Sequence, residues 1–249
     1  MSPVVEICCG SYYDARQAAL GGAERIELNA ALMLGGLTPT AATVRMVKEN
    51  LELKVVAMVR PRGAGFCYLE EEFAVMEREC REVLEAGADG AAFGCLLEDG
   101  SLDEEKTKRL LDVVKGVGRE AVFHRAFDCV EDPFGTMERL VGLGVDRVLT
   151  SGLKPTAVEG RDMIRTLQEQ YGDRIQILAG SGVNTQNARE LMEYTGIRQV
   201  HSSCKAWLRD STTVRNGVSY SMAGGDRAMC YDVVSRELVE SLVRRGQGF

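Results

Sequence analysis

The chain alternates short runs of apolar and β-branched residues with longer segments of helical periodicity, eight times in 249 residues. The runs that predict β-strands span residues 4–9, 25–29, 54–60, 90–95, 121–126, 147–151, 174–180 and 199–204. The segments that predict α-helices span residues 12–22, 39–50, 70–86, 103–116, 133–143, 155–171, 184–194 and 230–246. We expect the second helix to begin at Thr38 and Pro39, a capping residue followed by proline. This alternation predicts parallel strands, because a parallel pair needs a crossover connection.

Eight strand–helix units of this length predict a (β/α)8 TIM barrel that forms a single domain over residues 1–249. A doubly wound open sheet is the alternative, but it would use fewer strands, and no Gly-x-Gly-x-x-Gly motif follows the first strand. The polar segment 205–229 breaks the rhythm after the eighth strand. We expect a long loop there that serves as a lid or as an oligomer arm.

The net charge and the cysteine content limit the classes of partner and the cellular compartment that we expect. A net charge of −7 argues against nucleic acid as a partner, because phosphate binding needs a basic surface. No run approaches the ~20 apolar residues that cross a membrane, and residues 1–6 lack the basic segment of a signal peptide. Eight cysteines are scattered singly or as one adjacent pair, with no Cys-x-x-Cys motif. We therefore expect a cytoplasmic protein that keeps its cysteines as thiols.

Alternation along the predicted strands decides which side chains face the barrel interior. Apolar residues such as Ile7, Ile26 and Phe123 should pack on the helices, so the intervening residues should point inward. The inward set comprises Glu6, Cys8, Arg25, Glu27, Asn29, Arg60, His124 and His201, with Asp128 just beyond the fifth strand. Both histidines of the chain fall at the carboxyl halves of strands, the end where barrel enzymes build their active sites.

Six of these polar residues are expected at one mouth of the barrel: Glu6, Glu27, Arg60, His124, Asp128 and His201. As a catalytic site, Glu6, Glu27 and His124 would supply acid and base groups, and Asp128 would orient His124. The same set could bind a divalent metal through oxygen and imidazole. The structural alternative is an internal salt-bridge network in which Arg25 or Arg60 neutralises the two glutamates.

A second group of residues favours an anionic ligand. Gly180, Ser181 and Gly182 end the seventh strand and precede a helix, so their backbone N–H groups could approach an anion. Ser151, His201 and Ser202, from the ends of neighbouring strands, and the arginines Arg60 and Arg62 are expected to contribute further donors. The alternative is an ordinary tight turn capped by Asn184 or Thr185.

Cysteines offer a competing, soft-metal interpretation. Cys8 is the cysteine on the inward phase at the barrel mouth, and Cys67 follows the glycine-rich loop after the third strand. Thiolates select Cu(I), so Cys8 and Cys67 are the candidate metal ligands. The alternative for each cysteine is a small buried apolar residue, which is the expectation for Cys80 and Cys230.

The sequence resembles the CutC family over essentially its whole length. The matching stretches are Val5-Glu-Ile-Cys, Gly22-Ala-Glu-Arg-Ile-Glu-Leu, Gly35-Gly-Leu-Thr-Pro, Arg60-Pro-Arg-Gly-Ala-Gly-Phe, Phe123-His-Arg-Ala-Phe-Asp, Arg147-Val-Leu-Thr-Ser-Gly, Gly180-Ser-Gly-Val-Asn and His201-Ser. The resemblance implies a (β/α)8 barrel, a cytoplasmic location, self-association as a dimer or tetramer, and a role in copper homeostasis. Some relatives carry a cysteine after Ile-Glu-Leu where this chain has Asn29, so a two-cysteine site on the first two strands is incomplete here.

Three functions therefore remain open at the level of sequence. The first is a copper homeostasis protein that binds Cu(I) through Cys8 and Cys67. The second is an isomerase, lyase or hydrolase that acts by acid/base chemistry on a small anionic, carbohydrate-like substrate. The third is a catalytically silent scaffold that binds partners through residues 205–229.

Overall fold

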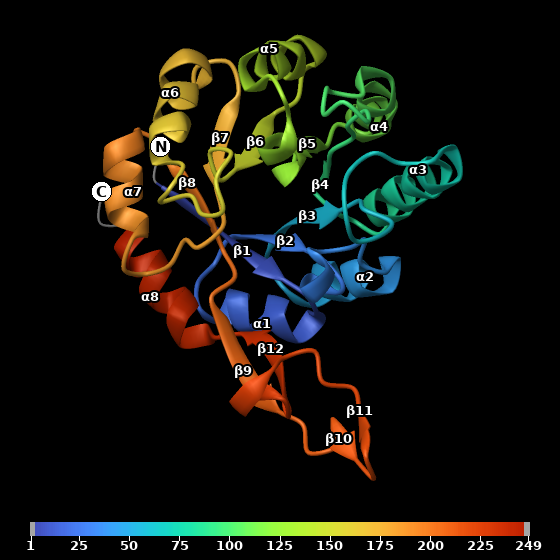
Figure 1. Cartoon of the computed structure of the whole chain (residues 1–249), viewed down its shortest axis with the longest axis vertical. Helices are drawn as coiled ribbons and strands as arrows, with labels where there is room; N and C mark the ends of the chain where they lie inside the picture. The colour runs from blue at the N-terminus through green and yellow to red at the C-terminus, as the bar shows by residue number, and fades with distance from the viewer. Residues whose placement is uncertain (1–2, 247–249) are drawn as a thin grey trace.

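The computed structural model describes residues 3–246 and confirms the predicted barrel (Figure 1). Eight parallel strands close in chain order, β1 pairing with both β2 and β8. Their bounds are β1 Val4–Cys9, β2 Arg25–Leu28, β3 Lys54–Met58, β4 Gly90–Phe93, β5 Glu120–Phe123, β6 Arg147–Thr150, β7 Gln176–Ala179 and β8 Gln199–Ser202. Most strands end earlier than predicted, because their last inward polar residues already belong to the loops that build the barrel mouth.

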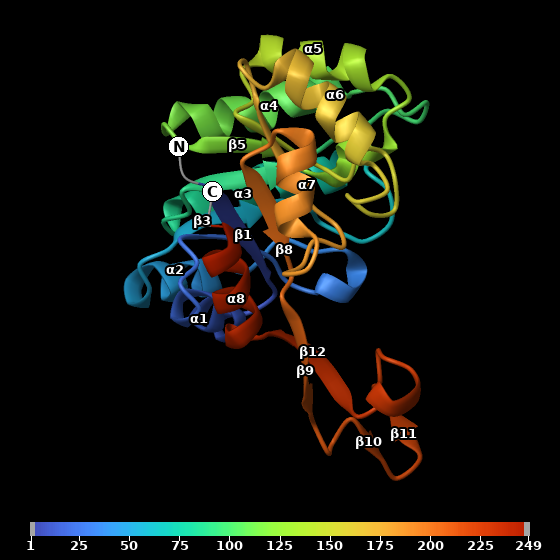
Figure 2. The same cartoon turned by 90° about the vertical axis from the view of Figure 1, so that its left-hand side faces the viewer.

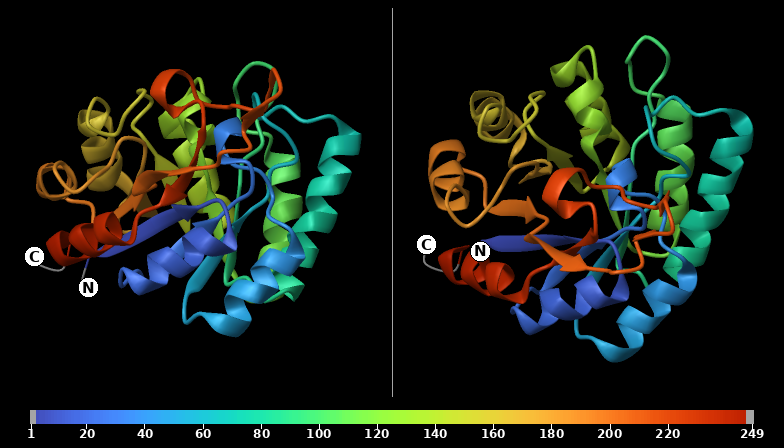
Figure 3. Two further views of the ribbon diagram at one scale, coloured as in Figure 1. Left: turned by 90° about the horizontal axis from the view of Figure 1, so that it is seen from below. Right: turned by 60° about the horizontal axis from the view of Figure 1, so that its bottom comes forward.

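The helices lie outside the strands, as the two views of Figure 3 show. They are α1 Tyr12–Leu20, α2 Ala41–Asn50, α3 Glu70–Glu85, α4 Glu104–Gly116, α5 Pro133–Leu143, α6 Arg161–Tyr171, α7 Ala188–Thr195 and α8 Arg236–Gly246. Helix α5 matches its predicted bounds, with Asp132 as cap and Pro133 in the first turn. In the described part of the chain, no helix combines the length and the apolar character needed to cross a bilayer.

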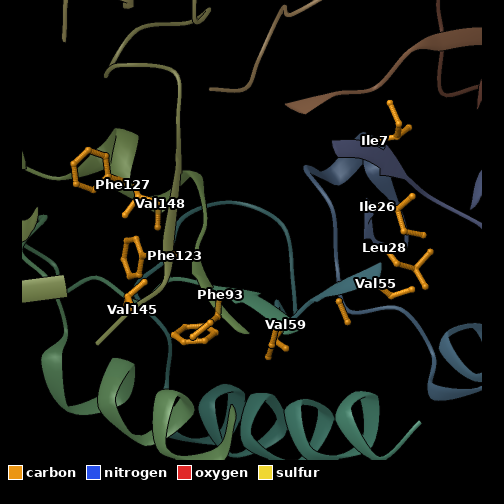
Figure 4. Close-up of a cluster of buried hydrophobic side chains, with 14 of the residues drawn as sticks. Ile7, Ile26, Leu28, Val55, Val59, Phe93, Phe123, Phe127, Val145 and Val148 are labelled. Atoms are coloured by element: carbon orange, nitrogen blue, oxygen red, sulfur yellow. The ribbon is translucent and has the colours of Figure 1, made fainter. Parts of the chain in front are cut away.

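The predicted side-chain phase of the strands is confirmed. Ile7, Ile26, Leu28 and Val55 follow one another on adjacent strands and pack in the core between barrel and helices (Figure 4). A separate cluster fills the barrel interior and consists of Val56, Met58, Ala92, Val122, Leu149 and Leu178. The residues between the outward-facing set therefore point inward, as a period of two requires.

Helices α2, α6, α7 and α8 each begin two or more residues later than predicted, and local hydrogen bonds account for α2 and α6. Helix α2 starts at Ala41, capped by the Thr40 hydroxyl, which accepts from the Thr43 N–H, so Thr38 is not its cap. Residues 155–160, predicted as helix, instead bond to the loop after β7: the Ala157 N–H donates to the Ser181 carbonyl at 3.0 Å. The Ser181 hydroxyl donates in return to the Pro155 carbonyl at 2.7 Å.

The segment after β8 is an antiparallel ribbon and not a structureless loop. Strand β9 (Lys205–Arg209) pairs with β12 (Cys230–Val234), where the sequence predicted helix. Cys-Tyr-Asp-Val-Val is rich in β-branched and aromatic residues, which favour a strand once a partner strand is present. The small hairpin of β10 (Val214–Arg215) and β11 (Val218–Ser219) ends the ribbon, which extends away from the barrel (Figures 1 and 2).

Candidate functional site

A cavity of about 570 Å3 opens at the carboxyl ends of the barrel strands. Polar residues from opposite sides of the barrel line it together with apolar walls. The lining includes Cys8, Glu27, Asn29, Leu32, Met58, Arg60, Phe66, His124, Arg125, Leu149, Ser181, Gly182, Val183, Asn184, His201, Ser202 and Lys205. A concave site with apolar walls and a few convergent polar groups is the usual form of a small-ligand site.

Glu6 is completely enclosed by ion pairs and does not line the cavity. Its carboxylate lies 2.6 Å from Arg25 Nε, 3.4 Å from Arg147 Nη1 and 2.9 Å from His201 Nδ1. Burial by itself raises the pKa of Glu6, but Arg25, His201 and Arg147 outweigh it and lower the pKa to about 2. The predicted salt-bridge network thus exists around Glu6, with Arg147 in the place that Arg60 was expected to take.

Beside this network, Cys8, Glu27 and His201 bring three potential ligand atoms together. One ligand atom from each of these residues lies within 4.8 Å of the others. His201 Nε2 is 4.0 Å from Glu27 Oε2, and Cys8 Sγ is 3.9 Å from the same oxygen. Asn29 Nδ2 donates to Glu27 Oε2 at 2.9 Å and fixes the carboxylate.

Burial and mutual contacts shift the pKa of each of these three side chains. Burial raises the pKa of Glu27 and that of the Cys8 thiol, although His201 opposes both shifts. Burial alone would lower the pKa of His201, but Glu27, Cys8 and Glu6 raise it well above its ordinary value. These shifts favour a thiol at Cys8 and an imidazolium at His201, beside the ionised Glu6.

His124 stands apart from this group and has an opposite character. Its Nδ1 accepts from the Ala126 N–H at 3.1 Å, and its buried Nε2 has no hydrogen-bond partner among the described residues. Burial, and then the charge of Arg60, lower the pKa of His124 to about 3, so the ring is neutral. The glycine at position 94 leaves room for this ring, because a Cβ there would lie 2.7 Å from it.

Asp128 does not orient His124, contrary to the prediction. Its carboxylate accepts from Arg125 Nε at 2.7 Å, from the Thr150 hydroxyl at 2.5 Å and from the Ser151 N–H at 2.9 Å. The short 3-10 helix Arg125–Cys129 turns Asp128 toward the end of β6, away from the imidazole. Asp128 therefore anchors the loop after β6.

The two arginines after β3 have different surroundings. Arg60 lines the cavity, and its guanidinium donates to the carbonyls of Leu34, Gly36 and Ala64 at 3.0, 3.1 and 2.5 Å. Arg62 turns away and pairs with Glu72 at 2.5 Å, on the first turn of α3. The structure thus brings Arg60, but not Arg62, to the cavity as a donor.

The remaining predicted residues divide between the cavity and its supports. Ser181, Gly182 and Ser202 line it, whereas Gly180 and Ser151 lie outside the lining. Cys67 is exposed and also lies outside it, so the structure does not bring Cys67 to Cys8.

Sequence reasoning missed Arg147, Phe66 and Lys205. Arg147 opens β6 two residues before the inward-facing Leu149, so alternation could have found it. Phe66 lies in a loop, and Lys205 opens β9, a strand that the sequence analysis did not predict.

Three comparisons place the chain among known proteins. The family model described as CutC family matches residues 3–206. A CutC family protein of Treponema denticola is 42% identical over 216 residues, 87% of each chain. The human copper homeostasis protein cutC homolog is 37% identical over 227 residues, 91% of this chain and 81% of its own. The crystal structure of the putative copper homeostasis protein CutC of Streptococcus agalactiae superposes with a TM-score of 0.76 at 29% identity and covers 81% of this chain and 98% of its own. This chain therefore belongs to the CutC family.

Proposed function

We propose that this protein serves copper homeostasis by binding a copper ion at Cys8, Glu27 and His201. The observation that carries the proposal is the convergence of a sulfur, a nitrogen and an oxygen ligand atom within 4.8 Å at the barrel mouth. The name of the human relative, a copper homeostasis protein homolog, supports copper as the ion. The enzyme hypothesis has less support, because Glu6 is held by ion pairs and neutral His124 is a weak base.

The surroundings of His201 match those of a metal ligand. Metal-binding histidines usually donate their second ring N–H to a carboxylate, which fixes the ring and its tautomer. Glu6 lies 2.9 Å from His201 Nδ1 and can take that role, which leaves Nε2 toward Cys8 and Glu27. Glu6 thus acts as a positioning residue for the proposed site.

The donor set also bears on the oxidation state of the ion. Soft Cu(I) favours several sulfur ligands, whereas one sulfur, one imidazole and one carboxylate form a set of intermediate softness. Asn29 is in contact with Cys8 at 3.6 Å and supplies no second thiol, and Cys67 is exposed and lies outside the cavity lining. We infer that the site accepts divalent ions such as Cu2+, Co2+ and Zn2+ as well as Cu(I).

Cys8→Ser is expected to weaken metal binding by at least ~10–100-fold. That is the usual effect of removing a residue that supports a metal ligand, and Cys8 is a proposed ligand itself. Co2+ is the first probe, because a cobalt–thiolate bond gives a near-ultraviolet charge-transfer band that the variant should lose. Anaerobic competition with a chromophoric chelator then gives the Cu(I) affinity. Cys129→Ser is the matched control, because Cys129 is exposed and lies outside the cavity lining.

Cys67→Ser distinguishes the site proposed here from the Cys8 and Cys67 site that the sequence predicts. If Cys67 were a ligand, its loss would weaken Cu(I) binding as strongly as the loss of Cys8. The structure predicts no change. Unaltered affinity in Cys8→Ser would refute the site.

We infer a reducing compartment, the cytoplasm, for this chemistry, because all eight cysteines are free and the Cys8 thiol must stay reduced to bind a metal.

We also infer self-association of the chain through the ribbon, which carries exposed Val218, Tyr220 and Met222 and begins where the family model ends. Light scattering should give the mass of an oligomer, and Tyr220→Asp with Val218→Asp should return the mass of one chain.

A further inference from the structure

Apart from the proposed metal group, the cavity is lined by a buried cation with no carboxylate partner and by a buried histidine N–H with no acceptor, among the residues that the structure describes. Arg60 and His124 are 5% and 3% exposed, and both line the cavity. They come from the ends of β3 and β5, whereas Cys8, Glu27 and His201 come from β1, β2 and β8. This second pair of residues therefore rests on observations independent of the metal group.

The positive charge of Arg60 has no carboxylate partner among the described residues. Its three hydrogen bonds go to neutral backbone carbonyls, and its Nε has no hydrogen-bond partner in the same set. A guanidinium has five N–H donors, so about two remain after these three bonds. A buried charge is normally paired, because burial without a counter-ion is costly.

His124 adds a donor of fixed direction. Because its Nδ1 accepts from the Ala126 N–H, the neutral ring carries its hydrogen on Nε2. That N–H has no acceptor among residues 3–246, and a buried donor without an acceptor is unfavourable because it has lost its hydrogen bond to water. Arg60 thus brings a positive charge and an unpartnered Nε–H, and His124 brings an unpartnered Nε2–H, among the residues that the structure describes.

Phe66 links the two groups. The centroid of its half-buried ring lies 5.0 Å from the centroid of the His124 ring and 5.1 Å from Arg60 Cζ. The ring follows the glycine-containing loop 63–65, and a Cβ on Gly65 would meet no atom within 4 Å. Phe66 thus lies beside both polar groups where they face the cavity.

We propose that Arg60 and His124 form a subsite for the anionic oxygens of a small organic carboxylate or phosphate. The cavity of about 570 Å3 has the size of a small-molecule site. Its apolar walls, Leu32, Met58 and Leu149, would hold the carbon part of the ligand. The other cations on the rim are already paired: Arg125 with Asp128 at 2.7 Å and Lys205 with Asp232 at 3.1 Å.

The two histidines of the chain make the test direct, because 15N-histidine labelling of the full protein yields only two imidazole rings. Metal-free protein is titrated with succinate and, separately, with inorganic phosphate, against sodium chloride at equal ionic strength. The proposal expects a saturable shift of the His124 Nε2 resonance with at least one of the two anions, and the stronger binder identifies the oxygen chemistry. No saturable shift with either anion at millimolar concentration overturns the proposal.

Variants then assign the binding to named groups. Arg60→Gln should weaken the binding of the anion about tenfold or more, as the loss of a charge-assisted hydrogen bond does. Arg62→Gln is the matched control on the same loop and should bind as the wild type, because Arg62 pairs with Glu72. Equal losses in both variants would mean general charge attraction and would refute the subsite.

Two further measurements test the proposal even if Arg60→Gln fails to fold correctly. His124→Gln keeps an amide donor and should retain most of the binding, whereas His124→Leu should lose it. The Co2+ affinity of Arg60→Gln should equal that of the wild type, so failure of the anion subsite is distinguishable from failure of the metal site. Anion binding that survives His124→Leu unchanged would contradict the proposal.

Discussion

Glu6→Gln should lower the free energy of unfolding by about 3–5 kcal/mol, the cost of removing one partner from a buried ion pair. Glu6 is 2% exposed and faces Arg25, Arg147 and the His201 ring at once. Glutamine keeps the shape of the side chain but removes the charge that these groups share, and it leaves Arg25 without a carboxylate partner among the described residues. Chemical denaturation followed by circular dichroism measures the loss.

Glu52→Gln is the control, because Glu52 is exposed, and its change should stay within about 0.5 kcal/mol. An equally small effect for Glu6→Gln would show that the network adds little to stability. The pH dependence supplies a second check. Since the pKa of Glu6 falls from its ordinary 4.5 to about 2, its contribution is complete above pH 4.5 and is lost as the pH falls toward 2. The variant should lack this part of the acid transition.

Metal affinity should rise steeply with pH, by about a hundredfold per pH unit near neutrality. In the metal-free site the thiol of Cys8 has a raised pKa, and that of His201 is raised well above its ordinary value, so both hold a proton. A bound metal must displace both protons, and raising the pH weakens that competition. The slope of log affinity against pH therefore approaches two.

Calorimetry in buffers of different ionisation enthalpy counts the released protons directly. In Cys8→Ser one of the two protons is gone, and the slope should fall to about tenfold per pH unit. Cys129→Ser should keep the full slope. Affinity that is flat between pH 6 and 8 would show that the ion does not bind to these two side chains.

The barrel and the inward set could be predicted from sequence because both follow from local periodicity. Glu6, Cys8, Glu27 and His201 sit one residue out of phase with Ile7, Ile26 and Val200, and a strand turns alternate residues to opposite faces. The ribbon strand Cys230–Val234 could not be recognised in this way, since its partner lies across a long connection. Its isolated pattern also suits a helix.

The sequence pattern accounts for the fold and for most of the side chains that face the barrel interior. Which of these side chains meet depends on how the barrel closes. Closure of β1 on β8 brings Glu6 to His201, 195 residues away, while the turn after β5 takes Asp128 from His124 and the start of α3 takes Arg62 from Arg60. Local periodicity fixes direction but not distance across a closed barrel. The charge state of each group depends on burial and on neighbours that only this closure supplies.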